Sequence, residues 1–398
     1  MPLSEYQAPG IYMEEVSTGA RPIQAVGTST AGFVGEAPNP DAYKNEARAI
    51  NNWTQFVKEF VKDGSASTPL SHAVYGYFIN GGRRCYVVNT GKGQAVSGGA
   101  APTGLDVLKP IDEVAIVAIP GYTDAASYDA ALSHCEELKD RVAVLDAPPK
   151  IIDVDLLTKA AQAPDPDLDP KAKPAPAGVK PRGSDHGYGA FYFPWIVVRD
   201  PLSPLQTATI PPSGHIAGIW ARTDATRGVH KAPANEAVRG ALRLSYPVSA
   251  QEQAKLNPLG VNCIRNFPEG ILVWGARTLA DGASEWRYLN VRRLFNMIEE
   301  SIVQSTRWVV FEPNDLSLWK SIRRDVSAFL RLLWRDGALM GATPEQAFFV
   351  KCDEETNPPE VVDAGQVVIL VGVAPVKPAE FVIFRIGQSA GGAQTETL

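Results

Sequence analysis

The sequence predicts an α/β domain followed by a smaller α+β domain, with a β-prone segment at each end of the chain. Between residues 31 and 145, short continuous apolar runs alternate with amphipathic stretches, which is typical of a parallel sheet covered by helices on both faces. A second series of strand-like and helical stretches begins near Val261. We therefore divide the chain into an N-terminal arm, an α/β domain, an α+β domain, and a C-terminal strand and tail, at residues 1–22, 23–255, 256–378 and 379–398.

The composition is that of an ordinary globular protein. The 398 residues are 45% hydrophobic and 9% aromatic, which is enough for two or three cores. The formal net charge is −6, so the chain has no general attraction for nucleic acid. No apolar run approaches the ~18–20 residues of a membrane span, and the first residues have no signal-peptide pattern. We expect a soluble protein made in the cytoplasm; if it acts outside the cell, it leaves by lysis or as part of a particle.

The α/β domain begins with an expected strand at 31–35 and two helices whose starts are marked. Asn52 is a helix cap before an apolar stripe with i, i+3, i+4, i+7 spacing. Thr68 followed by Pro next starts a second helix, which ends at Gly81. The next expected elements are strands at 85–88 and 114–119, a helix at 124–139, and strands at 142–145 and 190–198.

The segment 161–183 differs from both of its flanks. It is rich in proline and has almost no large apolar residues. Segments of this composition cannot bury enough apolar surface to fold. We expect a disordered, solvated loop inserted in the α/β domain.

The α+β domain is predicted from strands and two helices. Expected strands lie at 271–274, 308–311, 348–350 and 367–371. One helix carries an apolar stripe from Val291 to Ile302, and a longer one is capped by Asn314 or Asp315 and ends before Gly337. The longer helix also carries a basic stripe on one side, which is usually no more than a solvated face. The stripe consists of Lys320, Arg324, Arg331 and Arg335.

The N-terminal segment has no evident partner within the chain. Ile11, Tyr12 and Met13 lie among glycine and proline residues, without a helical period. Short β-prone pieces of this kind cannot form a core alone. An extended arm that pairs with another sheet is the natural interpretation, and a disordered tail is the alternative.

The C-terminal segment predicts a strand. Phe381, Ile383 and Arg385 would point to one side, and the residues between them to the other. An unpaired strand of this kind is an aggregation hazard, so it is a candidate to join the sheet of a neighbouring subunit. An ordinary last core strand is the alternative, and spacing alone slightly favours it.

No catalytic, cofactor or metal-binding pattern stands out. The sequence has no HExxH, P-loop or GxGxxG motif, and its four cysteines include no CxxC pair. Ser184 and Ser213 are close in sequence to His186 and His215, but catalytic partners meet in space, so this closeness means little. We predict buried, reduced cysteines, structural or surface histidines, no cofactor and no metal.

Nine segments carry long motifs in a consistent order along the chain. They begin with PGIYMEE and FVGEA, continue through FINGGRRCYVV, PSGHIAG and GVHKAPAN, and end with WGARTL, RRLF, EPND and PVKPAEF. Together they resemble the contractile phage-tail sheath protein family, over nearly the whole chain except the proline-rich insert. The compact size is similar to that of sheaths from extracellular injection systems and bacteriocin-like particles.

The resemblance implies a subtilisin-like, doubly wound α/β domain that lacks the catalytic groups of the protease, followed by a sheath C-terminal domain. It implies a helical homo-oligomer around an inner tube, with baseplate and terminal cap proteins as further partners, which contracts to drive the tube through a target envelope. It implies neither nucleic-acid binding nor direct membrane insertion. The two end segments would exchange strands between subunits, and the basic stripe would contact the inner tube.

Two other functions stay open from the residues alone. One is an active serine hydrolase on the same fold, and the other is a static structural or surface-layer protein. Electron microscopy separates contractile tubes from discrete monomers and from a static lattice. The sequence is compatible with a phage tail, a bacteriocin and an injection system.

Overall fold

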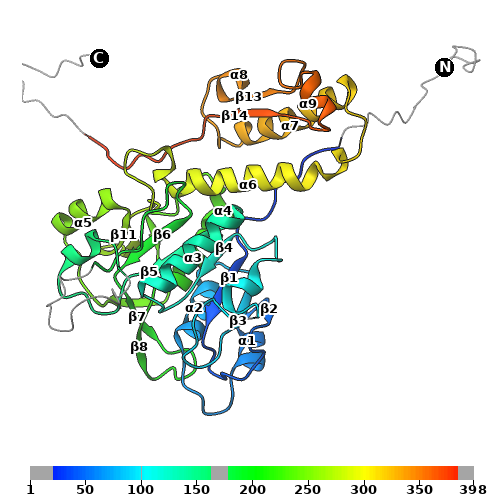
Figure 1. The fold of residues 1–398 in the computed structure, drawn as a ribbon. Helices are drawn as coiled ribbons and strands as arrows, with labels where there is room; N and C mark the ends of the chain where they lie inside the picture. The colour runs from blue at the N-terminus through cyan, green and yellow to red at the C-terminus, as the bar shows by residue number, and fades with distance from the viewer. Residues whose placement is uncertain (1–20, 100, 163–177, 384–398) are drawn as a thin grey trace, which may run out of the picture.

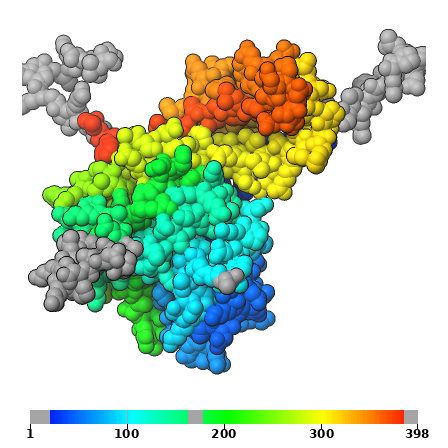
Figure 2. Space-filling model, in the orientation of Figure 1, coloured from blue at the N-terminus to red at the C-terminus, as the bar shows by residue number. Residues whose placement is uncertain are grey.

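The computed structural model describes residues 21–99, 101–162 and 178–383. A large body (residues 29–288) carries a smaller C-terminal unit (residues 289–376 with the linker at residues 21–28). Helix α6 (Leu289–Ser305) lies between the two parts (Figure 1). In the space-filling view the rest of the C-terminal unit sits above α6 and the body lies below it (Figure 2). None of the helices in the described ranges is both long and apolar enough to span a bilayer.

The body is built on a nine-stranded mixed sheet, in the order β2-β3-β1-β4-β5-β6-β11-β12-β9. The six strands from β3 to β11 in this order are parallel, and the other three pair antiparallel at the two edges. The strands are β1 (Ala31–Gly35), β2 (Ala47–Ile50), β3 (Cys85–Asn89), β4 (Ile116–Ala118), β5 (Val142–Asp146), β6 (Gly189–Phe193), β9 (Glu236–Ala237), β11 (Val261–Phe267) and β12 (Gly270–Val273).

Helices cover both faces because the central strands are apolar on both sides. In β1, for example, Phe33 belongs to one core and Val34 to the other. The first core includes residues of α1 (Trp53–Phe60), α2 (Pro69–Asn80) and α4 (Ser213–Arg227). The second includes residues of α3 (Ala125–Leu138), α5 (Ala250–Leu256) and the 3-10 turns η1 (Gly104–Leu108) and η2 (Val154–Thr158).

Helices α2 and α4 approach closely because glycines of α4 face the contact. A Cβ atom on Gly214 would lie 2.2 Å from the Cα atom of Ala73, and one on Gly218 would lie 2.5 Å from the carbonyl oxygen of Tyr77. Both distances are too short for real Cβ atoms. Any larger residue at either position would therefore force the two helices apart.

The predicted helix starts are confirmed. Four side chains accept a hydrogen bond from the backbone N–H three residues further on: Asn52, Thr68, Asp124 and Asp315. Gly81 ends α2 with a φ of 118°, in the left-handed region that glycine adopts without a steric penalty.

Beside the main sheet, a small antiparallel sheet contains β10 (Ala241–Leu244), β7 (Ile196–Arg199) and β8 (Thr207–Ile210) in that order.

The C-terminal unit has its own apolar core. Helix α7 (Leu316–Arg335) packs its predicted apolar side into this core, and Ile23 of the linker is buried there as well. The remaining elements are α8 (Pro344–Ala347), β13 (Phe348–Lys351), α9 (Pro359–Asp363) and β14 (Leu370–Val373). β13 and β14 pair antiparallel as a two-stranded sheet.

The predicted strand at 308–311 is wrong. The chain forms the 3-10 turn η5 (Arg307–Val309) there, and Phe311 has a φ of 71°, which interrupts any extended run. The apolar, β-branched composition suggested a strand, but a strand is stabilised by its neighbours, and these residues pair with no strand in the described chain. The strand expected at 367–371 begins later, as β14.

The main sheet crosses the boundary expected at residue 256. Val261 and Cys263 of β11 pair with Phe191 and Phe193 of β6, so residues after 256 complete the body. The separate core of the C-terminal unit begins with α6. In the predicted last strand, residues 381–383 have no regular secondary structure, and residues 384–386 lie outside the described residues, as do residues 163–177 of the predicted insert.

Candidate assembly interface

The two serines considered for hydrolysis donate hydrogen bonds to carboxylates, and of the two histidines His186 is exposed and His215 is buried. The hydroxyl of Ser213 donates to the buried carboxylate of Asp146 at 2.6 Å, and its backbone N–H donates at 2.8 Å. Burial raises the pKa of Asp146 to about 7, against the opposing effect of these two bonds. Ser184 donates to Glu136 at 2.7 Å. Neither ring nitrogen of the buried His215 has a hydrogen-bond partner in the described residues, so no serine–histidine pair forms there.

The cysteines are structural, as the sequence predicts. All four are free and buried, and burial raises the pKa of each thiol. Within the described ranges, no group of three or more His, Cys, Asp or Glu side chains is arranged to hold a metal ion. The contacts that characterise this molecule lie instead where the body meets the C-terminal unit.

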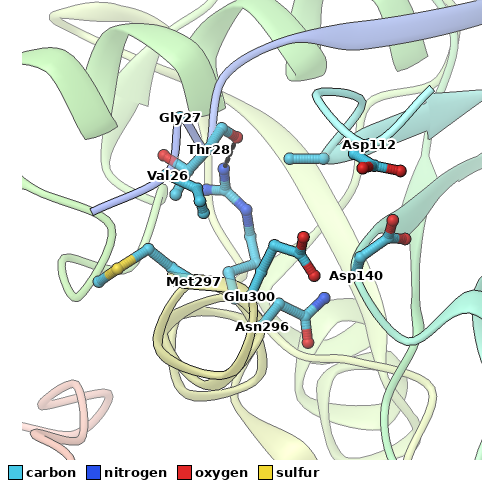
Figure 3. Close-up of a pocket in the computed structure, with 10 residues that line it drawn as sticks. Val26, Gly27, Thr28, Asp112, Asp140, Asn296, Met297 and Glu300 are labelled. Carbon is cyan, nitrogen blue, oxygen red and sulfur yellow. Dashed lines mark hydrogen bonds between the residues drawn. The ribbon is translucent and has the colours of Figure 1, made fainter. Parts of the chain in front are cut away.

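A buried ion pair joins these two parts. Arg293 on α6 donates to both carboxylate oxygens of Asp224 on α4, at 2.9 and 2.6 Å. It also donates to the carbonyl oxygen of Thr28 at 2.9 Å (Figure 3). The Thr28 hydroxyl donates to the same Asp224 carboxylate at 2.6 Å. The two charged side chains are 3% and 6% exposed, so loss of either one would leave the other buried without its partner.

The cavity beside this ion pair is too small for a ligand. Its volume is about 20 Å³, which is room for about one water molecule. Asp112, Asp140 and Glu300 line it together with Asn296 and Met297 of α6 (Figure 3). We interpret the contact around Arg293 and Asp224 as packing between the body and the C-terminal unit.

The linker lies along α6 before the chain enters the body. The backbone N–H of Val26 donates to the Ser301 hydroxyl at 3.0 Å. At the start of the linker, the backbone N–H of Arg21 donates to Asp325 of α7 at 3.4 Å, and its guanidinium lies over the ring of Trp308, 4.6 Å from the centroid. The described chain therefore begins at the C-terminal end of α6 (Figure 1).

The chain leaves at the opposite end of α6, where an ion pair anchors it. Arg277 donates to both carboxylate oxygens of Glu380, at 3.0 and 2.6 Å, and the Tyr288 hydroxyl donates to the same carboxylate at 3.4 Å. Burial alone would raise the pKa of Glu380, but the Arg277 guanidinium and these hydrogen bonds hold it below its ordinary value. Directly after this anchor, Phe381 and Ile383 are 73% and 79% exposed.

The hairpin of the C-terminal unit has two open edges. Within the described residues, β13 pairs only with β14. Two strands alone form a marginal sheet, and unpaired edges present N–H and C=O groups that can bind an added strand. Phe349 of β13 and Leu370 of β14 are about half exposed. The sheet is therefore suited to completion by other chain segments.

The predicted basic stripe lies on the outer face of α7. Lys320, Arg324, Arg331 and Arg335 are all exposed, whereas the apolar side of the helix is buried in the core. Arg324 donates to the neighbouring Asp325 at 2.9 Å. The sequence pattern thus placed these four side chains correctly on the surface.

The structure describes part of the predicted arm contacts. Ile11, Tyr12, Met13 and Arg385 lie outside the described residues. Sequence reasoning missed both ion pairs, which join residues 69 and 103 positions apart. The arginine of the first pair lies in the RRLF motif and the glutamate of the second in PVKPAEF, so the motifs were the signal that could have found them.

These features define a structural subunit with open strand edges and a separately anchored chain end. Residues 101–279 match the phage tail sheath protein central domain, and residues 281–389 match the phage tail sheath C-terminal domain. The chain therefore belongs to the phage tail sheath family, and it is a sheath structural protein rather than an enzyme.

Solved structures extend the match to almost the whole chain. A sheath chain of the PVC extracellular contractile injection system, in its contracted state, is 30% identical with a TM-score of 0.76, over 97% of this chain and 98% of that chain. A chain of the anti-feeding prophage (AFP) baseplate is 31% identical with a TM-score of 0.74, over 96% and 99%. The tail sheath protein of Vibrio phage KVP40 is 29% identical over 177 residues, and the match spans 44% of this chain but only 26% of that protein.

Proposed function

We propose that many copies of this chain polymerise helically around an inner tube, stand on a baseplate, and contract to drive the tube through a target envelope. The observation that carries the proposal is the likeness to a contracted sheath chain over almost the full length of both chains. The particle would be an extracellular injection system assembled in the cytoplasm and then released. Terminal cap proteins would complete it.

The body would correspond to a subtilisin-like domain without hydrolase chemistry. Its parallel strands, with α2 and α4 on one face, support this assignment. The direct hydrogen bond from Ser213 to Asp146 supports the loss of catalysis, because the serine of a subtilisin-type triad is paired with a histidine base. A fluorophosphonate probe that labelled one serine stoichiometrically would contradict this assignment.

The two ends of the chain would link neighbouring subunits by strand exchange. Segments around Ile11, Tyr12 and Met13, and around Phe381, Ile383 and Arg385, would add to the open edges of β13 and β14 in other copies. Backbone hydrogen bonds would hold these joints while rigid bodies change their packing during contraction. The exposed apolar residues after the Glu380 anchor support this role.

The basic stripe on α7 would meet an acidic surface of the inner tube. Exposed charge pairs contribute about 0–1 kcal/mol each, so many weak contacts could hold the extended state and still release. Arg331→Glu with Arg335→Glu should give empty, contracted sheaths, and high salt should shift the wild type in the same direction. Lys58→Glu with Lys62→Glu, in and just after α1 on the body, is the matched control. Extended, contraction-competent particles from the α7 variant would exclude this helix as the tube contact.

Electron microscopy of the full chain, expressed with its tube and baseplate proteins, tests the proposal as a whole. We expect helical tubes in an extended form that shorten when triggered. Discrete monomers, or a lattice that never changes length, would contradict a contractile sheath.

A further inference from the structure

The loop between α6 and α7 ends in an exposed apolar tip, which we define as residues 310–315. The side chain of Phe311 is fully exposed, and that of Val310 is 63% exposed. Phe311 also has a φ of 71°, a left-handed conformation that bulky residues rarely adopt and that glycine adopts freely. A strained backbone that presents an aromatic ring to solvent points to a function for that ring.

A large groove lies at the other end of the same pair of helices. Its volume is about 910 Å³, and residues of α5, the strand end at Trp274 and the C-terminal stretch 376–382 line it. Gly337, two residues after α7, also lines it. The exposed Ala254 and the aromatic Trp274 give it an apolar surface. The groove is therefore open to an aromatic side chain.

The groove and the tip carry opposite charges. Arg227, Lys231 and Lys377 line the groove, and none of them forms a salt bridge within the described chain. The acidic residue that lines it, Glu380, is already bound to Arg277. In the tip, Glu312 is exposed and has no salt bridge in the described residues. The two surfaces thus have the complementary charge that orients partners.

The two surfaces cannot meet within one chain. Helix α6 has 17 residues, so it separates its two ends by roughly 26 Å. The tip follows its C-terminal end, whereas the groove lies near Ala276, whose carbonyl oxygen accepts the backbone N–H of Leu289 at the N-terminal end. A tip that fits a groove at the opposite end of an identical molecule makes a head-to-tail contact, which can repeat from copy to copy in a ring or in an open helix.

We propose that the tip of one copy docks into the groove of the next copy, with Phe311 against Ala254 and Trp274 and with Glu312 facing Lys231 and Lys377. The inference rests on the proposed assembly of many copies. It adds a side-chain contact between copies to strand exchange, and the groove shares Phe381 and Val382 with the C-terminal segment proposed for that exchange. It also gives a function to the strained conformation of Phe311.

Cysteine cross-linking tests the contact directly in assembled full-length protein. The native thiols are buried, so Phe311→Cys and Ala254→Cys supply the accessible thiols. After oxidation and denaturation, we expect no covalent dimer from either variant alone. A mixture of the two variants should give covalent dimers, and the double variant should give a ladder of covalent oligomers. Tubes that form without any cross-link between these positions would overturn the proposal. So would a disulfide between two copies of the Phe311→Cys single variant, or a cross-link from that variant to the inner tube protein.

Glycine substitution separates the contact from folding. Phe311→Gly relieves the backbone strain, so we expect an unchanged or higher melting temperature but a loss of tubes of about tenfold or more, as for other aromatic anchors of interfaces. Leu205→Gly, which removes another fully exposed apolar side chain, is the control and should assemble normally. Normal assembly of Phe311→Gly would overturn the proposal.

A charge exchange completes the test. Glu312→Lys should reduce assembly, and adding Lys231→Glu with Lys377→Glu should restore it; failure of the restoration would contradict the assigned pairing. If the wild type forms no tubes with its tube and baseplate proteins, the proposed function fails. If the wild type assembles and the variants behave like it, only the tip–groove contact fails.

Discussion

The body and the C-terminal unit differ in how much of their apolar surface is buried within the chain. In the body, six parallel strands are covered on both faces by helices from the same chain. Of the eighteen large apolar side chains that are exposed in the described residues, nine lie in the C-terminal unit and three more in the chain end that follows it. They include Phe311 of the tip and Phe349 and Leu370 of the hairpin. The body is thus complete on its own, whereas the C-terminal unit leaves surface for neighbouring subunits.

Removal of either chain end should break this comparison most strongly. We expect chains without residues 1–20, or without residues 381–398, to form no tubes while the body keeps its fold, because the missing segments would supply strands to other copies. The second truncation retains Glu380, so the Arg277 anchor stays paired. Electron microscopy reports assembly and circular dichroism reports the fold. Long, normal tubes from either truncation would exclude strand exchange.

Breaking the buried ion pair should uncouple the two parts. Asp224→Asn leaves Arg293 buried opposite a neutral group, and we expect a loss of about 3–5 kcal/mol in the free energy of unfolding, with the C-terminal unit melting first. Adding Arg293→Met should recover much of the loss. Calorimetry would resolve the two transitions.

The matched control is an exposed pair between the same two parts. Asp112 faces Arg307 at 3.5 Å, with side chains 59% and 67% exposed. Asp112→Asn should cost less than about 1 kcal/mol. Equal losses from Asp112→Asn and Asp224→Asn would mean that burial does not set the strength of this joint.

Acid should weaken the body through its buried histidines. Burial lowers the pKa of His215 to about 3 and of His134 to about 4, and it also lowers the pKa of His72. Below about pH 6.5 the unfolded chain therefore binds more protons than the folded chain, and stability falls as the pH falls. Asp146 acts in the opposite direction, because its pKa is raised to about 7.

The histidine effect can be isolated with a single variant. Urea unfolding at about pH 7 and about pH 5 should show a smaller loss of stability for His134→Leu than for the wild type. The variant lacks one histidine that takes up a proton when the chain unfolds. His186→Leu is the control, since His186 has no such buried position. An identical pH dependence of His134→Leu and the wild type would rule out this source of acid sensitivity.

The smallest effect should come from the proline-rich insert. Replacing residues 163–177 with a short Gly/Ser linker should change the free energy of unfolding by less than about 1 kcal/mol and leave assembly normal, because closure entropy depends weakly on loop length. Arg182, which pairs with Asp129 and Glu136, stays in place. Loss of tubes, or of a co-purifying protein, would indicate that the insert binds a partner.

Local patterns in the sequence predicted much of the fold. The caps at Asn52, Thr68, Asp124 and Asp315 depend on residues within one turn, so their chemistry is visible in the sequence. The apolar side of α7 follows the helical period in the same way, and so do the exposed positions of its basic stripe.

Features that depend on distant residues were not predictable. The run at 308–311 has the composition of a strand, but no strand of the described chain comes to lie beside it. The pairing of β11 with β6, and the Arg293–Asp224 and Arg277–Glu380 ion pairs, join residues far apart in sequence. The family motifs, rather than residue spacing, indicated the function. A contact between sheath subunits is made by two chains, so it produces no periodic pattern in the sequence of a single chain.

The course of the linker decides which part of the molecule bears mechanical load. Arg21 and Val26 are held by α7 and α6 before the chain reaches β1, and Glu380 is held beside the other end of α6. A pull on the N-terminal end therefore reaches α7 and α6 first, whereas a pull on the C-terminal end reaches the body at Arg277 and Tyr288. Tension between the two ends would therefore cross the contact between the C-terminal unit and the body, where Arg293 pairs with Asp224.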